Sequence, residues 1–135
     1  MSHSEIRCEA LPNGLTVLLC ESAIAPVAEI QLWAKVGSAD ERPFESGLAH
    51  FHEHMLFKGT ERRAVGDVAG DIEGAGGRIN AYTSFDVTCY HATLPSDQLE
   101  AGVDVLTDAL LHSTFVAEEI DREIEVVLEE IRRSE

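Results

Sequence analysis

Two histidines and a glutamate within five residues could form a hydrolytic metal site. The segment His50-Phe51-His52-Glu53-His54 reads H-x-x-E-H. On a helix, His50 and His54 lie one turn apart on the same face, where two imidazoles can hold one Zn²⁺. Glu53 follows His50 by three residues and projects toward the same side of the helix. A hydrolytic zinc site needs a general base there, next to the water that the metal binds. The segment therefore predicts a zinc site with Glu53 as its base.

A third protein ligand is expected, because catalytic zinc usually takes three and leaves one position to water. Residues 118–135 carry apolar side chains at three- and four-residue spacing, which predicts an amphipathic helix. Glu123 and Glu130 share one face of that helix beside its apolar stripe, where a buried carboxylate needs a partner. Glu130 is the candidate ligand, and Glu129, about 100° around the helix, is its rival. The acids expected to be solvated are Glu118, Glu119, Glu125 and Glu135.

The motif and the last helix together resemble a known family. HFHEH at 50–54 and REIEVVLEE at 122–130 resemble the pitrilysin-type zinc peptidases, or inverzincins, which include insulin-degrading enzymes and mitochondrial processing peptidases. In that family a zinc-binding Glu follows the motif by some 75 residues, and here 75 residues lie between His54 and Glu130. The resemblance implies that Glu130 is the third ligand and that Glu123 supports the ligands from behind.

Other segments extend the resemblance over nearly the whole chain. Residues 11–15 look like the family's opening hairpin turn, and residues 47–49 and 55–60 look like the flanks of its motif. Residues 80–84 (NAYTS) look like its substrate strand. The resemblance implies that Asn80 and Ala81 contact the substrate backbone, the alternative for Asn80 being a turn residue. A peptide or small-protein substrate would then add as a strand beside residues 78–84.

These residues predict a zinc-dependent metalloendopeptidase. His50, His54 and Glu130 hold Zn²⁺, while Glu53 takes a proton from the attacking water and delivers it to the leaving nitrogen. One alternative is a non-catalytic structural or partner subunit of the same fold, which the intact site residues disfavour. Another is a metal-dependent enzyme of a different class, such as a lyase, because fold alone does not determine function.

The length of the chain and the way it ends predict that it is part of a larger protein. A chain of 135 residues is one domain or part of one, and its last helix is charged and lacks a stop signal. Because members of the resembled family are longer, we expect residues 1–135 to be the N-terminal portion of a single zinc-peptidase domain. The rest of that domain and a second homologous domain that closes the site would be absent. Such a fragment should show little activity alone and should self-associate through unpaired strand edges.

Composition excludes several other classes of protein. The net charge of −15 argues against nucleic-acid binding, because phosphates attract Lys and Arg. No apolar stretch approaches the roughly 18 residues of a membrane span, and the N-terminal residues do not read as a signal peptide. Cys8, Cys20 and Cys89 lack paired spacing and are expected to be reduced thiols. Together these features favour a cytoplasmic location.

The predicted elements place the motif on a helix behind a sheet. Strands are expected at 5–10, 15–21, 27–37, 78–84 and 86–94, and helices at 47–57, 64–74, 96–112 and from 117 onward. Ser46 is the expected N-cap of the motif helix, and Gly59 follows its end. This order predicts an α+β fold, an antiparallel-rich sheet with helices packed on one face. The histidines not expected to bind metal are His3, His52, His91 and His112.

Overall fold

The computed structural model describes residues 5–134, so His3 and Glu135 lie outside the described residues. Its strands are β1 (Ile6–Ala10), β2 (Thr16–Cys20), β3 (Val27–Ala34), β4 (Arg78–Thr83) and β5 (Thr88–Pro95). Its α-helices are α1 (Leu48–Met55), α2 (Asp67–Gly74), α3 (Leu99–His112) and α4 (Ala117–Ser134). Three short 3-10 helices are η1 (Ser38–Asp40), η2 (Pro43–Glu45) and η3 (Ser96–Gln98). All strand pairing is antiparallel, which confirms the predicted α+β fold.

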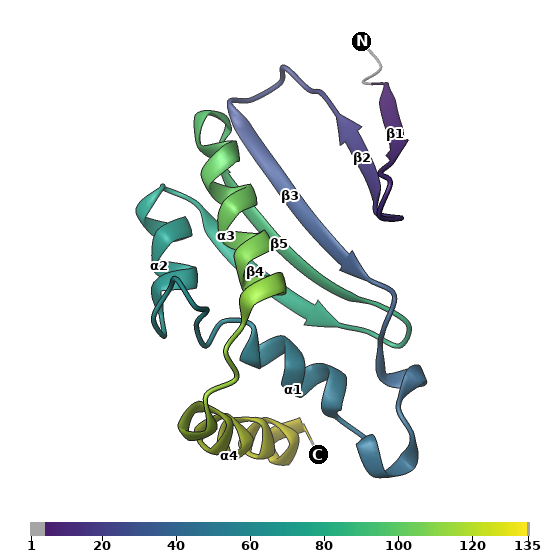
Figure 1. Ribbon diagram of the computed structural model, residues 1–135, viewed down its shortest axis with the longest axis vertical. Helices are drawn as coiled ribbons and strands as arrows, with labels where there is room; N and C mark the ends of the chain where they lie inside the picture. The colour runs from purple at the N-terminus through teal and green to yellow at the C-terminus, as the bar shows by residue number, and fades with distance from the viewer. Residues whose placement is uncertain (1–4, 135) are drawn as a thin grey trace.

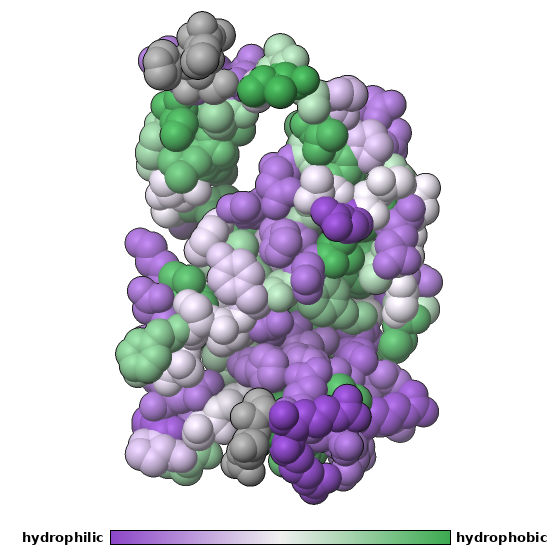
Figure 2. Space-filling model, turned by 180° about the vertical axis from the view of Figure 1, so that it is seen from behind, coloured by the Kyte–Doolittle hydropathy of each residue, from purple (hydrophilic) through white to green (hydrophobic). Residues whose placement is uncertain are grey.

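Strands β1 and β2 form a hairpin that stands apart from the rest of the chain (Figure 1). Asn13 shapes its turn, because the Asn13 side-chain oxygen accepts a hydrogen bond from the Leu15 N–H at 3.1 Å. Nearly every strand residue of the hairpin is exposed, including Leu18 and Ile6. Seen from behind, the hairpin is largely hydrophobic and an open gap separates it from the body (Figure 2).

The second sheet has the order β3-β5-β4, and its central strand β5 is the most buried. The register sets Ile30 beside Ala92 and Ala92 beside Ile79, so apolar side chains line one face. Helices α2 and α3 cover that face (Figure 1), whereas the opposite face is largely hydrophilic (Figure 2). The buried core is Leu56, Val68, Ile72, Tyr90, Ala92, Leu94, Val105, Leu106 and Ala109. Burying one large apolar side chain stabilises a fold by about 1.5–3 kcal/mol.

The start of the motif helix differs from the sequence-based expectation. Gly47, not Ser46, is the N-cap of α1, and its φ of 92° is left-handed. The Glu41 carboxylate accepts hydrogen bonds from the N–H groups of Gly47 at 2.8 Å and Ala49 at 2.7 Å. These two donors lower the pKa of Glu41. A carboxylate from the preceding loop therefore satisfies the helix N-terminus, as a local Ser cap would otherwise do.

Two other boundaries moved for reasons of tertiary contact. Strand β3 ends at Ala34, three residues early, because Ser38 and Ala39 donate backbone hydrogen bonds to the β4–β5 turn at Ser84 and Phe85. The helix expected from Ser96 begins as η3, so α3 starts at Leu99. The other predicted elements lie within a few residues of the observed ones.

The loop after α1 ties the last two helices to the motif. Thr60 bridges to Ser113, and the Thr114 N–H donates to the Gly59 carbonyl at 3.3 Å. The Asp108 carboxylate, which is wholly buried, accepts hydrogen bonds from Thr60 at 2.7 Å and from Arg63 at 2.6 Å. These contacts join the 59–63 loop to the end of α3, where the chain turns into α4. They therefore keep the point from which the chain enters α4 close to the loop that follows α1.

Two simpler findings concern the whole described chain. No helix among residues 5–134 is long and apolar enough to cross a bilayer. Cys8, Cys20 and Cys89 are free thiols, as expected, and Cys89 is the buried one.

Candidate metal centre

Three donor atoms from two helices converge beside the motif. The Nε2 atoms of His50 and His54 lie 3.1 Å apart on α1. Glu130 of α4 brings its Oε2 atom to 3.7 Å from His50 Nε2 and 3.5 Å from His54 Nε2. Ligands of a tetrahedral zinc, each about 2.0–2.2 Å from the ion, lie about 3.3–3.6 Å from one another. The observed triangle has nearly these dimensions, so the three side chains fit one zinc ion.

Glu123 lies directly behind this triangle. Its Oε1 atom is 2.8 Å from His54 Nδ1, and its Oε2 atom pairs with the Lys58 ammonium. Burial alone would raise the pKa of Glu123, but the hydrogen bonds from Lys58 and His54 outweigh it and lower that pKa. A carboxylate at Nδ1 requires the hydrogen of His54 on that nitrogen. The Nε2 lone pair then faces His50 and Glu130, as a metal ligand must.

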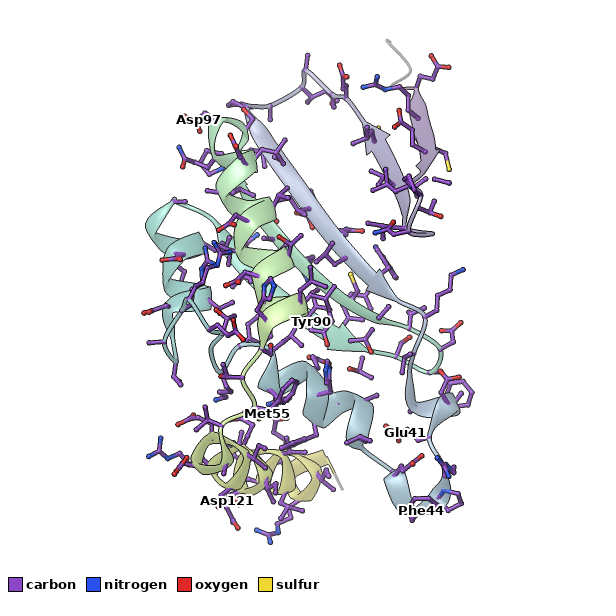
Figure 3. All side chains as sticks on the ribbon, viewed as in Figure 1. Glu41, Phe44, Met55, Tyr90, Asp97 and Asp121 are labelled. Carbon is purple, nitrogen blue, oxygen red and sulfur yellow. The ribbon has the colours of Figure 1, made fainter. Side chains whose placement is uncertain are left out.

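The rival carboxylate and the other acids of α4 point elsewhere. Glu129 pairs with Arg133 at 3.5 Å and lies near Arg132 at 4.0 Å, so it faces solvent, not the histidines. Asp121 lies on the side of α4 away from α1 (Figure 3). Glu118 and Glu125 are exposed as expected, but the prediction for Glu119 was wrong. Glu119 is buried and pairs with Arg122 one turn later, which compensates its charge.

Glu53 is oriented by the end of the neighbouring strand. The Thr83 hydroxyl of β4 donates a hydrogen bond to Glu53 Oε2. Burial and the nearby Glu53 carboxylate raise the pKa of Tyr90 to about 12. Met55, two residues on, is buried where α1 meets α4 (Figure 3). Glu53 therefore lies between the motif helix and β4, on the side of the helix where the sheet ends.

Asn80 and Ala81 lie within β4, which excludes the turn alternative for Asn80. Among the described residues β4 is an edge strand of its sheet, because β5 is the one strand that pairs with it. The Asn80 side-chain oxygen accepts a hydrogen bond from the Ala81 N–H at 2.9 Å. Thr83, which holds Glu53, follows on the same strand. The edge that carries Asn80 and Ala81 thus runs toward the candidate base.

The other described histidines lie outside the donor triangle, as expected, and His112 ends α3. His52 faces away from the donor triangle, with its Nδ1 atom 3.3 Å from the Tyr90 hydroxyl and its ring against Phe115. Burial lowers the pKa of His52. The His91 ring lies 3.4 Å from Glu29, and His112 lies 3.1 Å from Asp108.

Three residues near the site escaped the sequence analysis. Lys58 carries a helical signal, because it follows His54 by four residues, as His54 follows His50. Thr83 lies in residues 80–84, which resemble the family's substrate strand, but nothing in the sequence pairs it with Glu53. Glu41 carries no signal, because its contact with the start of α1 depends on the fold of the loop between them. Figure 3 shows Glu41 beside the start of α1.

Comparison with known proteins decides the family. Residues 16–135 match the family described as Insulinase (Peptidase family M16). The chain belongs to peptidase family M16. This confirms the resemblance to insulin-degrading and processing peptidases, and the family's H-x-x-E-H pattern stands at residues 50–54.

Relatives within family M16 are named as zinc proteases and processing peptidases. The chain is 41% identical over 135 residues to a probable mitochondrial-processing peptidase subunit beta of Arabidopsis thaliana, covering 100% of this chain and 25% of that protein. It is 39% identical over 125 residues to an uncharacterized zinc protease of Rickettsia bellii, covering 93% of this chain and 30% of that protein. The crystal structure of pitrilysin superposes with a TM-score of 0.89 at 28% identity, covering 98% of this chain and 14% of pitrilysin. The chain thus spans less than a third of the length of these relatives.

Proposed function

We propose that this chain carries the zinc site of an M16 metalloendopeptidase, with His50, His54 and Glu130 as the zinc ligands and Glu53 as the general base. The observation that carries the proposal is the donor triangle, with separations of 3.1, 3.5 and 3.7 Å. Two imidazoles and one carboxylate, with a fourth position open, are a donor set typical of hydrolytic zinc. Zinc in such a site supplies Lewis acidity to a peptide carbonyl and to water.

The chain's own residues account for the remaining chemistry. Glu53, held by the Thr83 hydroxyl, accepts a proton from the attacking water and returns it to the leaving nitrogen. Glu123 keeps the His54 ring in one orientation through the bond at Nδ1. Proton transfer by Glu53 and metal binding by His54 each need a side chain held in one orientation. The residues that hold them, Thr83 of β4 and Glu123 of α4, come from elements other than α1.

The outer strand β4 is the proposed binding site for the substrate backbone. The Ala81 N–H donates a hydrogen bond to the Asn80 side-chain oxygen at 2.9 Å. A peptide that pairs with β4 would accept this hydrogen bond through a backbone carbonyl, in place of the Asn80 oxygen. Backbone pairing gives affinity with little sequence preference, which fits a peptide or small-protein substrate. Freed from Ala81, the Asn80 amide would itself be available to the substrate backbone.

The activity of the whole protein is a broader proposal, because the chain covers 25% and 30% of its relatives' lengths. We propose that further regions, including a second homologous domain, close over the site, and that this chain alone has little peptidase activity. Self-association through its exposed strands and a cytoplasmic location are part of the same proposal. The rival candidate, a non-catalytic subunit of the same fold, is disfavoured by the complete set of His50, Glu53, His54 and Glu130.

Zinc stoichiometry tests the site. Purified chain should hold about one zinc ion, and Glu130→Ala should weaken that binding because it removes one of three ligands. Glu129→Ala is the matched control, since Glu129 pairs with Arg132 and Arg133. Equal loss in both variants, or no zinc in the wild-type chain, would contradict the ligand assignment.

A further inference from the structure

Glu123, which supports His54 from behind the candidate metal site, also pairs with the ammonium of Lys58. Among the ion pairs of residues 5–134, Lys58 is the one lysine in contact with these site residues. We infer that Lys58 is a positioning residue for this site, acting through Glu123 on the orientation of His54. The inference rests on the proposed zinc site and adds a residue to it. Lys58 would touch neither the metal nor the substrate.

The geometry places three side chains in series. Lys58 pairs with Glu123 Oε2, and Glu123 Oε1 lies 2.8 Å from His54 Nδ1. His54 Nε2 then lies 3.5 Å from Glu130 Oε2. Each carboxylate oxygen of Glu123 therefore has its own cationic or N–H partner. With both oxygens held, the carboxylate has one orientation, and so does the imidazole that it contacts.

Burial makes this pair different from an ordinary surface ion pair. The exposed fractions of the side chains are 6% for Glu123, 17% for His54 and 27% for Lys58. Exposed pairs usually contribute little, whereas a buried carboxylate depends on its partners. Loss of the ammonium would leave Glu123 with a single bond, to His54. The carboxylate could then rotate, and His54 would no longer be held with its Nδ1 hydrogen toward α4.

The backbone at Lys58 is itself well fixed. Its N–H donates to the Met55 carbonyl at 3.0 Å, which continues the turn of α1. Gly59 follows with a left-handed φ of 105° and leads directly into Thr60, which the buried Asp108 holds. The backbone that carries the Lys58 side chain is therefore held by α1 and by the loop that follows it. The position of the Lys58 ammonium thus does not depend on α4 alone.

The test uses Lys58→Met, which keeps an unbranched side chain of nearly the same length and removes its charge. Zinc affinity, measured by competition with a chromophoric chelator, should fall about tenfold. In the zinc-free chain, ¹⁵N NMR should show His54 with its hydrogen on Nδ1 in the wild type and a mixture of tautomers in Lys58→Met. Lys58→Arg should restore both readouts toward wild type, and Lys35→Met, at the chain's other, exposed lysine, should change neither.

A second variant separates positioning from general stability. In a Glu123→Ala background, Lys58→Met should cause no further loss of zinc affinity, because its route to His54 is already gone. An additional tenfold loss there, or wild-type affinity and tautomer in Lys58→Met alone, would overturn the inference. If the wild-type chain binds no zinc, the proposed function fails. The His54 tautomer in the zinc-free chain still decides the role of Lys58.

Discussion

His54 Nδ1 on α1 lies 2.8 Å from Glu123 Oε1 on α4, although 69 positions separate the two residues in the chain. The Glu123 side chain is only 6% exposed, so water competes little for the bond. This contact forms only when α4 docks on α1. The same docking brings Glu130 to the histidines, so assembly of the ligand set and orientation of His54 are one structural event.

Removing the Glu123 carboxylate should therefore weaken zinc binding without removing a ligand. We expect Glu123→Ala to lower zinc affinity about 10–100-fold, as is typical when a ligand loses its orienting partner. Chelator competition measures the change. Glu125→Ala, two residues along the same helix and exposed, is the control and should bind zinc like the wild type. Unchanged affinity in Glu123→Ala would show that His54 needs no support from α4.

Glu53→Gln should separate metal binding from hydrolysis. The amide keeps the shape and can still accept the Thr83 hydrogen bond, but it cannot take a proton from water. Zinc affinity should stay near wild type, while peptide hydrolysis should fall about 10²–10⁴-fold. Because this chain alone is expected to have little activity, a fluorogenic peptide assay on the full-length protein, wild type and variant, measures the second effect. Wild-type turnover in the variant would rule out Glu53 as the base.

Asp108→Asn should destabilise the fold, because the wholly buried Asp108 carboxylate holds Thr60, Arg62 and Arg63. Removing one charge from a buried ion-pair network costs about 3–5 kcal/mol of the free energy of unfolding. Urea unfolding at neutral pH measures the loss. Asp97→Asn, at an exposed position in η3, should change stability little. A loss no larger than that of Asp97→Asn would mean that the network does not stabilise the fold.

The same residue predicts a dependence of stability on pH. Burial would raise the pKa of Asp108, but hydrogen bonds from Thr60, Arg63 and Arg62 lower it well below its ordinary value of 3.8. The unfolded chain therefore takes up a proton at Asp108 before the folded chain does as the pH falls. Its contribution is complete above about pH 5 and declines as the pH drops through the acid range. Asp108→Asn should flatten that part of the stability curve.

Gly59→Ala should destabilise the loop that joins the motif helix to the Asp108 network. Gly59 has a φ of 105°, and an added Cβ would lie 2.9 Å from the Arg63 carbonyl oxygen. Strain and contact together should cost about 1–3 kcal/mol. Gly66→Ala is a close control, because Gly66 has a φ of 93° and nothing within 4 Å of the added atom. Thermal unfolding should show the larger loss for Gly59→Ala, and equal losses would contradict the close approach.

The sequence predicted the elements and the candidate ligands where the signal is local. His50, Glu53 and His54 lie within five residues, and Glu123 and Glu130 lie two turns apart on one helix, so helical periodicity alone places each group. The amphipathic spacing of residues 118–135 likewise predicted α4 and favoured Glu130 over Glu129. A periodic pattern reports which side chains share a face, whereas the separate roles of Glu130 as ligand and Glu123 as its support were implied by the family resemblance.

Only the tertiary structure decided which further side chains hold the motif helix and the site residues in place. The Glu41 carboxylate at the start of α1, the Thr83 hydroxyl on Glu53 and the Lys58 ammonium on Glu123 each join segments with no common period. The tertiary structure also buries Glu119, which the sequence predicted to be solvated. Such contacts depend on how helices and strands pack, and packing follows from the shapes of whole elements. The sequence by itself determined what the site could contain, and the packing of α4 and β4 on α1 determined how it is held.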